Sequence, residues 1–350
     1  MLKTEIRKIN PLQPEQTIIM QAASIISNGG LVAFPTETVY GLGANGLDDV
    51  AARRIFAAKG RPADNPLILH IADQAEIRPL VKSVPANAIA LMNAFWPGPL
   101  TVVLERSELV PDAVTAGLDT VAIRLPRSLI ARRLIQAAGV PIAAPSANAS
   151  GRPSPTTAQA VWFDLVGKLD MILDGGQCDV GLESTVVDCT TPVPTLLRPG
   201  GITREMLLAV LGELELDRNL SDQTSAPRSP GMKYTHYAPA APMILIDALP
   251  PADTVKLLLR EVNLALAAGK RVGAVTSAET AALLPKGVLG AVYGPRGDKE
   301  QMAGNVYECL RRFDKSPVDV IFGEAVDEAG IGLAIMNRLR KAAGYRIISG

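Results

Sequence analysis

Short apolar strands alternate with amphipathic helices along most of the chain, and this alternation constrains the fold more than any other feature. Residues 15–27 carry apolar side chains at helical spacing, Asn28-Gly29-Gly30 ends that pattern, and the apolar run 31–34 follows directly. The same reasoning predicts helices over 48–58, 86–94, 128–138 and 203–211, and strands over 67–71, 100–104, 121–125, 141–144, 171–173, 184–188 and 195–198. Because few helices separate the later strands, we expect a mixed sheet rather than a purely parallel one.

The last third of the chain is more regular. Strand patterns at 243–246, 272–276, 288–293 and 318–322 alternate with helix patterns at 252–268, 278–284, 299–313 and 333–343. Strict alternation of this kind predicts a small doubly wound, Rossmann-like parallel sheet. At roughly 150 residues per domain, a chain of 350 residues also has the length for two domains.

The segment between these two parts, residues 213–240, loses periodicity and gains proline, serine and charge, which is typical of an interdomain linker. Its stretch SPGMKYTHYAP, residues 229–239, holds two tyrosines, a histidine and a lysine, which is unusual for a solvated tether. We therefore predict an α/β protein with a first domain over 1–212, a linker over 213–240 and a second domain over 241–350.

Composition excludes several classes of function. Lys and Arg number 35 and Asp and Glu number 35, and neither half has a large excess, so a binding site for anions must be a local cluster. Aromatic residues make up 4%, which disfavours stacking platforms for single-stranded nucleic acid. Cys178, Cys189 and Cys309 form no CxxC pair and only two histidines are present, so we expect no structural zinc site. The charged start and the lack of a long apolar run predict a cytoplasmic protein.

One candidate motif is the segment Gly41–Gly46, which reads GxGxxG, with Asp73 placed where a ribose-binding acid could stand. This pattern favours a dinucleotide-dependent oxidoreductase as one hypothesis. Against it, six residues separate Phe34, the end of the predicted strand, from the first glycine, whereas the fingerprint begins where its strand ends. The alternative is a glycine-rich turn without a ligand.

A second candidate follows the helix predicted at 48–58. Lys59 and Arg61 stand one residue apart in an extended, proline-restrained stretch, so their cations point the same way and suit a phosphate chain. A solvated surface turn is the alternative. Asn65 and His70 lie nearby, and a histidine at a strand end is more often structural than functional.

A third set of polar residues lies at other strand ends. Ser146 and Asn148 alternate in the loop PSANAS, so in an extended backbone both face one side. Arg124 and Arg198 lie in apolar strands, where each needs an anionic partner or ligand, and Ser184 begins another strand. Together these residues are rich in anion donors and poor in titrating bases, which favours chemistry on a nucleoside triphosphate over hydride transfer or metal-dependent hydrolysis.

The segments that carry these residues occur in a recognisable order. GGLVAFPTETVYGLGAN, KGRPADNPL, FWPGPLT, VAIRLP, APSANASGRPSPT, ESTVVD and LRPGG resemble, over about residues 12–211, the threonylcarbamoyl-adenylate synthase family with its YrdC-like domain. The KxR and SxN signature of that family reads Lys59, Arg61, Ser146 and Asn148 here. The resemblance implies a YrdC-like twisted mixed sheet, and the remaining chain resembles the long, two-domain form.

The resemblance implies a reaction of L-threonine, bicarbonate and ATP that yields L-threonylcarbamoyl-AMP and pyrophosphate, with Mg²⁺ on the phosphates. The product then serves N6-threonylcarbamoyladenosine formation at position 37 of tRNAs that read ANN codons. A separate transferase machinery accepts the product, so tRNA is expected to be an indirect partner. Lys59 and Arg61 are the implied catalytic residues. ATP contacts are implied for Lys59, Arg61, Asn65, Thr120, Ser146, Asn148, Ser154 and Arg198, and threonine contacts for Thr38, His70, Arg124, the backbone at Ala144 and Ser184.

In the long form the linker acts as a lid over the active site, and Tyr234 or His236 would then reach the nucleotide. Such a lid would keep water from a labile mixed anhydride. A non-catalytic RNA-binding module remains the second alternative hypothesis, which the neutral charge of each half disfavours.

Overall fold

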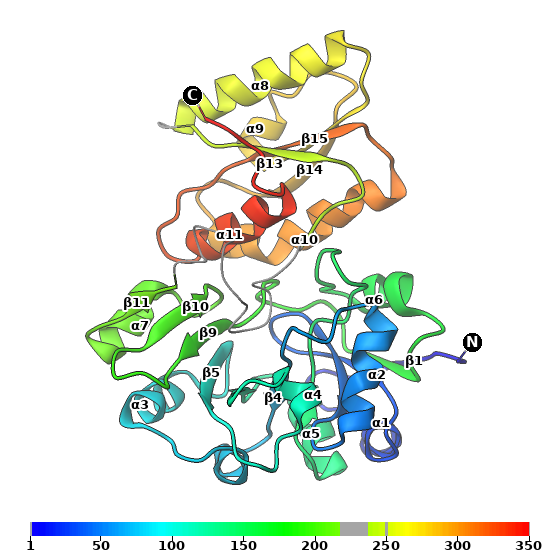
Figure 1. Cartoon of the computed structure of the whole chain (residues 1–350). Coiled ribbons are helices and arrows are strands. Elements are labelled where there is room, and N and C mark those ends of the chain that lie inside the picture. The colour runs from blue at the N-terminus through cyan, green and yellow to red at the C-terminus, as the bar shows by residue number, and fades with distance from the viewer. Residues whose placement is uncertain (1, 218–236, 249–250, 350) are drawn as a thin grey trace. The chain divides into compact units, whose positions relative to one another are not determined.

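The computed structural model describes residues 2–217, 237–248 and 251–349 and divides them into two compact units (Figure 1). The first unit holds most of residues 2–217. The second holds the described residues from Tyr237 onward, together with the short segments Gly151–Pro153 and Val180–Leu182. The predicted linker, 213–240, falls mostly outside the described residues.

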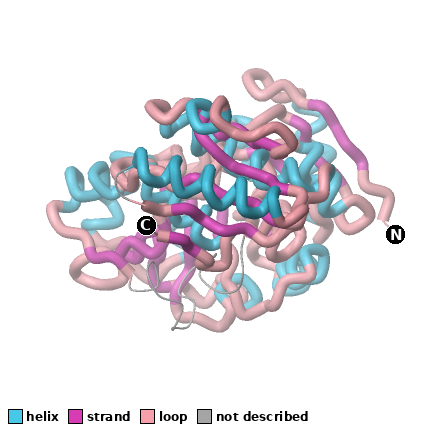
Figure 2. The backbone as a smooth tube through the Cα atoms, turned by 90° about the horizontal axis from the view of Figure 1, so that it is seen from above, coloured by secondary structure: helices cyan, strands magenta, loops and turns pink. Residues whose placement is uncertain are grey.

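The first unit is built on a mixed sheet, as the sequence predicts, with strand order β1-β8-β2-β3-β7-β4-β6-β5-β9-β10-β11. The edge strand β1 lies nearest the N-terminus (Figure 2). The strands are β1 Glu5–Lys8, β2 Val32–Pro35, β3 Tyr40–Asn45, β4 Ile68–His70, β5 Leu100–Glu105, β6 Thr120–Arg124, β7 Ile142–Ala143, β8 Met171–Asp174, β9 Thr185–Asp188, β10 Thr195–Arg198 and β11 Glu215–Leu216. The helices are α1 Gln16–Ser27, α2 Asp49–Lys59, α3 Ala86–Phe95, α4 Asp112–Thr115, α5 Leu129–Ala138, α6 Ala158–Leu165 and α7 Arg204–Leu211, with a 3₁₀ helix at Gln74–Leu80.

Side chains alternate between the two faces of this sheet and pack into separate cores. On one face, apolar residues of the strands meet α2, α3 and α6 in the largest core, to which Leu69, Val102 and Ile123 belong. On the other face, α1 and α5 pack over Val32 and Phe34 of β2 and over their neighbours in β7 and β8. Strands buried on both faces explain why their sequences read as continuous apolar runs.

The GxGxxG segment lies within and just after strand β3, so the dinucleotide-binding hypothesis is wrong. A phosphate-binding fingerprint needs a loop that opens a helix, but Gly41 and Gly43 belong to an extended strand paired with β2. A Cβ on Gly43 would lie 2.7 Å from Cε1 of Phe34, so the glycine serves close strand packing. Asp73, the supposed ribose acid, caps the 3₁₀ helix by accepting a hydrogen bond from the amide of Ala75 (2.8 Å).

The second unit is the predicted doubly wound parallel sheet. Its strand order is β14-β13-β15-β12-β16 and all of its pairs are parallel. The elements are β12 Met243–Ile246, α8 Pro251–Ala267, β13 Val272–Ser277, α9 Ala278–Ala281, β14 Leu289–Gly294, α10 Lys299–Lys315, β15 Val320–Glu324, α11 Gly332–Ala342 and β16 Ile347–Ile348. Helices α8 and α9 lie on one face of this sheet, and α10 and α11 pack together on the other (Figure 1).

Across the described ranges, none of the helices combines the length and the apolar character needed to cross a membrane.

Candidate functional site

The candidate site lies on the face of the first unit's sheet that also carries α1 and α5. Beyond those helices, this face carries a small apolar cluster of Ile68, Val103, Ala122, Val186 and Leu197. Strand alternation puts His70 of β4, Arg124 of β6 and Thr101 of β5 on the same face as this cluster. Apolar side chains thus form a floor, and charged or hydroxyl-bearing side chains stand at its ends.

Lys59 joins two segments that are far apart in the sequence. It is the last residue of α2, and Gly60 ends the helix in the left-handed conformation (φ 61°), which turns the chain toward Arg61. The Lys59 ammonium donates to the carbonyl oxygens of Ser146 and of Asn148, the latter at 2.6 Å. The hydroxyl of Ser146 in turn donates to Oδ1 of Asn148 (2.6 Å). The KxR and SxN segments therefore form one hydrogen-bonded unit around a buried cation.

Arg61 and Asn65 form a tight local turn. Nη2 of Arg61 donates to the carbonyl oxygens of Asn65 (2.9 Å) and Pro66 (3.2 Å), and its guanidinium lies over the ring of Phe56. The side chain of Asn65 is buried, and among the described residues its Oδ1 has no hydrogen-bond donor. A buried acceptor without a partner costs free energy, so this amide is a group for which a ligand can provide the donor.

Arg124 is enclosed by groups from the loop after β2. Its Nη1 donates to Oγ1 of Thr38 (2.9 Å) and its Nη2 to Oε1 of Glu37 (2.7 Å). Oε2 of Glu37 accepts from the amides of Arg127 and Ser128. Burial would raise the pKa of the Glu37 carboxyl, but the charge of Arg124 and these hydrogen bonds outweigh it and lower the pKa. The Glu37 carboxylate is therefore ionised at neutral pH.

His70 lies beside Arg124 in the neighbouring strand, in register with it. Its ring is buried, and its Nδ1 lies 3.2 Å from the carbonyl oxygen of Ile68. Burial, and then the positive charge of Arg124, lower the pKa of His70 to about 3. A neutral imidazole can orient a hydroxyl or an amine, but it carries no charge for an anion and is a weak proton acceptor at neutral pH.

Ser184 and Arg198 form a third group at the start of β9. Arg198 donates to the carbonyl oxygen of Ser184 from Nε (3.0 Å) and to its hydroxyl from Nη2 (3.1 Å). Oγ1 of Thr101 lies 2.7 Å from the same hydroxyl. The sequence prediction includes neither Thr101 nor Glu37, although both stand in quoted motifs, because a threonine in a strand and an acid in a loop look ordinary until the pairing partners are known.

The remaining predicted residues are distributed more widely. Ser154 is fully buried and donates its hydroxyl to Oε1 of Glu183, a carboxylate that the sequence prediction also misses. The amide of Ala144 donates to the carbonyl oxygen of Ile68 (2.9 Å), so that donor is already used. Thr120 begins β6 and shares the face of Arg124, but roughly 13 Å of strand separates the two residues. The predicted residues Tyr234 and His236 lie outside the described residues.

No cluster of three or more His, Cys, Asp or Glu side chains that could hold a metal ion occurs in residues 2–217, 237–248 and 251–349. The donor set at Lys59, Ser146 and Asn148 is an ammonium, a hydroxyl and an amide. Such groups suit a phosphate chain better than a resident divalent cation, which prefers carboxylate oxygens.

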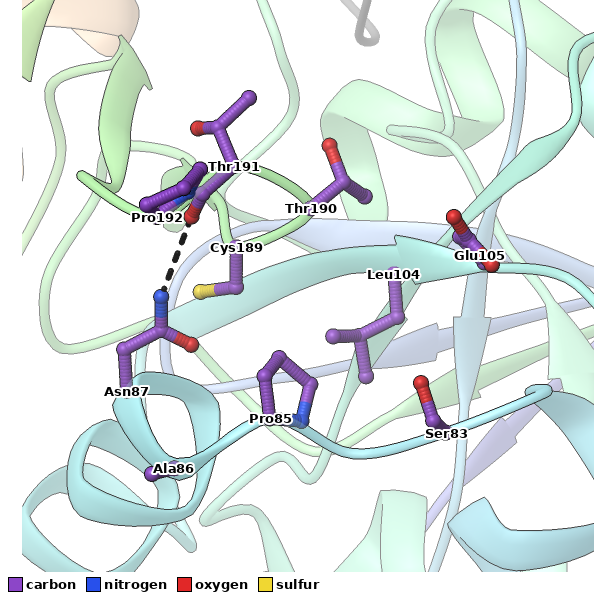
Figure 3. Close-up of a pocket in the computed structure, with 10 residues that line it drawn as sticks. All are labelled: Ser83, Pro85, Ala86, Asn87, Leu104, Glu105, Cys189, Thr190, Thr191 and Pro192. Carbon is purple, nitrogen blue, oxygen red and sulfur yellow. Dashed lines mark hydrogen bonds between the residues drawn. The ribbon is translucent and has the colours of Figure 1, made fainter.

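A separate pocket of about 550 Å³ lies at the carboxyl ends of β5 and β9, between Glu105 and Cys189 (Figure 3). The site residues Thr101 and Ser184 lie at the beginnings of the same strands. Nδ2 of Asn87 donates to the carbonyl oxygen of Thr191 across the pocket. None of the predicted site residues lines this pocket. The site is therefore located by the hydrogen-bonded polar groups on the sheet face and not by this pocket.

Comparison with known proteins matches both parts of the chain to family models. The model described as "Telomere recombination" matches residues 24–200, and the model described as "Threonylcarbamoyl-AMP synthase, C-terminal domain" matches residues 202–344. Proteins named threonylcarbamoyl-AMP synthase from Bacillus subtilis and Pyrococcus abyssi are each 49% identical, the first over 94% of both chains and the second over 95% of this chain and 96% of its own. The crystal structure of P. abyssi Sua5 complexed with L-threonine superposes with a TM-score of 0.93 at 46% identity and covers 99% of each chain.

Proposed function

Because the chain belongs to the threonylcarbamoyl-AMP synthase family, we propose that its first unit condenses L-threonine, bicarbonate and ATP into L-threonylcarbamoyl-AMP and pyrophosphate. The observation that carries this proposal is the contact of Lys59 with both Ser146 and Asn148. It brings a cation, a hydroxyl and an amide together, and such groups can stabilise the negative charge that develops during adenylyl transfer.

The reaction needs alignment and charge stabilisation more than acid–base chemistry. The amine of threonine attacks bicarbonate and water leaves, which gives a carbamate. One oxygen of the carbamate then attacks the α-phosphorus of ATP, the bond to the β-phosphate oxygen breaks, and pyrophosphate departs. A neutral His70 and the scarcity of titrating bases fit such a sequence, because the enzyme mainly has to hold the reactants in line.

We assign Lys59 and Arg61 to the triphosphate. The Lys59 ammonium is buried at the end of α2 and orders the backbone of the loop that carries Ser146 and Asn148. A positive charge fixed beside that loop stabilises the negative charge that builds on the departing phosphates. ATP would bring Mg²⁺ on its phosphate oxygens, and the ion would supply additional neutralisation of charge on the leaving pyrophosphate. Asn65, Ser154, Arg198 and, at the far end of the floor, Thr120 are the proposed further contacts of ATP.

We assign the groups around Arg124 to the binding of threonine. Arg124 already holds Thr38 and Glu37, so a threonine carboxylate would compete with Glu37 for the guanidinium or share it. His70 would orient the amine or hydroxyl, and Ser184 and the backbone at Ala144 complete the proposed pocket. The product would pass to a threonylcarbamoyl-transferring enzyme that modifies tRNA, in the cytoplasm, and any link of this chain to tRNA would be indirect.

The test is pyrophosphate release from ATP by the full chain, with threonine and bicarbonate each present or withheld. We expect release that requires both, and a decrease of about 100-fold or more in Lys59→Ala, since a buried charged donor is removed. Lys82→Ala, at an exposed lysine of the same unit, is the matched control and keeps the full rate. Tryptophan fluorescence checks that Lys59→Ala is folded.

Release without threonine would mean that another acceptor is used, and equal rates in Lys59→Ala and the control would remove Lys59 from the mechanism. No release under any condition, together with salt-sensitive tRNA binding, would favour the RNA-binding hypothesis.

A further inference from the structure

The second unit holds a cavity of about 230 Å³ at the carboxyl ends of its parallel strands. The residues that line it follow the ends of strands β12, β13, β14 and β15 or lie in the first turns of two helices. They are Asp247 and Ala248 after β12, Ser277 at the end of β13, Tyr293 and Arg296 at the end of β14, Glu324 through Asp327 at the end of β15, Thr254 in the first turn of α8, and Lys299 and Met302 in that of α10.

The topology of the sheet opens a crevice at this place. The chain leaves β12 for α8 and leaves β13 for α9, both on one face, whereas it leaves β15, which lies between those strands, for α11 on the opposite face (Figure 1). Neighbouring strands whose connections diverge to opposite faces leave a gap beyond their carboxyl ends. In open α/β sheets, ligands bind in this gap.

Each carboxylate that lines the cavity has a cationic partner: Glu324 has Arg296, Asp327 has Lys299, and Asp247 has Arg340 at 3.4 Å. The Glu324 carboxylate is buried, accepts a hydrogen bond from Nη2 of Arg296 (2.7 Å), and accepts two more from the amide and hydroxyl of Ser277. Lys299 pairs with Asp327, which is mostly exposed. A cationic ligand would therefore find no unpaired buried carboxylate at Glu324.

Donor capacity, in contrast, remains. The hydrogen bonds of Arg296 to Glu324, Ser277 and Thr280 all leave from Nη2, so within the described part of the chain Nη1 and Nε have no acceptor. The Arg296 side chain is 44% exposed, while Glu324 fixes one end of it. A guanidinium held on one side and open on the other is a preorganised donor for planar or tetrahedral anions. The Lys299 ammonium stands on the same cavity wall.

We propose that this cavity binds a small organic anion, a phosphate monoester or a carboxylate, with Arg296 and Lys299 as its anion-binding residues. The cavity volume limits the ligand to about the size of a sugar phosphate or a dicarboxylic acid. Ala248, Met302 and Val326 provide the apolar part of the wall, and Tyr293, whose hydroxyl donates to the carbonyl oxygen of Glu324 (3.0 Å), lies beside them. The site lies entirely within the second unit and does not depend on the reaction proposed for the first.

Hydrogen–deuterium exchange of the full chain tests this proposal. The probes are ribose 5-phosphate, L-malate and inorganic phosphate, with neutral ribose as the control, each at up to ~10 mM, which reaches affinities in the millimolar range. We expect an anionic probe to slow exchange in the segments 294–303 and 324–330, and ribose to have no effect. Protection by ribose 5-phosphate alone identifies a phosphate ligand, and protection by malate alone identifies a carboxylate ligand.

Arg296→Gln should weaken the protection about tenfold or more, because it removes a charge-assisted contact. Arg271→Gln is the matched control, at an exposed arginine of the same unit that pairs with Asp319. This variant should show the same protection by the anion as the original chain. If Arg296→Gln alters exchange throughout the unit, Lys299→Gln replaces it. No protection with any anion, protection by ribose as strong as by the anions, or protection unchanged in both variants would overturn the proposal.

Discussion

Each unit of the protein places an arginine–glutamate pair at the end of a strand, and the two pairs differ in how far they are enclosed. Arg124–Glu37 and Arg296–Glu324 both have N–O distances of 2.7 Å. Both glutamate side chains are buried, but Arg124 is 4% exposed and Arg296 is 44% exposed. The same pair of groups can thus fix a guanidinium completely or hold it by one side only.

The enclosed pair depends on complete compensation. Taking two charges out of water costs several kcal/mol per ion, and good geometry with further hydrogen bonds offsets that cost. Glu37 accepts hydrogen bonds from Arg124 and from the amides of Arg127 and Ser128, and Arg124 donates a further one to Oγ1 of Thr38. In the half-open pair, Arg296–Glu324, water can also bind the arginine. The cost of removing its charge from water is therefore smaller.

The largest expected effect comes from breaking the enclosed pair. Glu37→Ala should lower the free energy of unfolding of the first unit by about 3–5 kcal/mol, because it leaves the Arg124 charge buried without its partner. Both tryptophans, Trp96 and Trp162, belong to the first unit, so urea unfolding followed by tryptophan fluorescence reports this unit alone.

Asp179→Asn is the matched control for that measurement. The Asp179 carboxylate pairs with Arg127 at 3.7 Å, and both side chains are more than half exposed. The decrease in the free energy of unfolding in this variant should therefore be close to zero. A loss in Glu37→Ala no larger than in this control would mean that water reaches Arg124, and the contrast between the two pairs would disappear.

The pH dependence of the first unit gives the next largest effect. His70 has a pKa of about 3 in the folded chain and about 6.5 when unfolded, so between these values the unfolded chain binds the extra proton. The stability that His70 contributes is therefore fully present above pH 6.5 and is lost as the pH falls toward 3. From pH 7 to pH 5 we expect the free energy of unfolding to fall by about 2 kcal/mol.

The matched variant is His70→Gln, which keeps a polar side chain but does not titrate. Urea unfolding at pH 7, 6 and 5 should give a nearly flat profile for this variant and a falling one for the original chain. A flat profile for the original chain would show that the ring is protonated or hydrated in the folded state, and the floor around Arg124 would then be less enclosed than its burial indicates.

Much of the fold can be predicted from the sequence because apolar periodicity records burial directly. The elements that escape are those without such a pattern. Strand β1 reads Glu5-Ile6-Arg7-Lys8 and is exposed along its length, as suits an edge strand that must resist further pairing. Strand β3 has glycines where apolar side chains would be expected, because Phe34 and Ile142 occupy their space. Helix α6 lies close after a loop rich in proline and serine, which hides its start.

The site residues likewise fall into those that the sequence identifies and those that it misses. Lys59, Ser146 and Asn148 could be identified because their spacing is local, and the structure brings these segments together. Glu37, Thr101 and Glu183 could not, because each acts through a partner distant in the sequence: Arg124, Ser184 and Ser154. Spacing along a chain shows which side chains share a face, but only the register between strands shows which ones meet.

The smallest expected effect comes from the half-open pair Arg296–Glu324. It tests whether the exposure of the arginine explains the difference between this pair and Arg124–Glu37. Glu324→Gln keeps an oxygen for the amide of Ser277 but removes the charge that holds Arg296. Because Arg296 is 44% exposed, water can replace the lost partner, and we expect opening of β13 and β15 to become easier by about 1 kcal/mol, measured by native-state hydrogen exchange. Lys256→Gln, at an exposed ion pair on α8 of the same unit, should leave those amides unchanged. A loss in Glu324→Gln as large as in Glu37→Ala would mean that Arg296 depends on its carboxylate as completely as Arg124 does, so that it would have no free side to offer an anion.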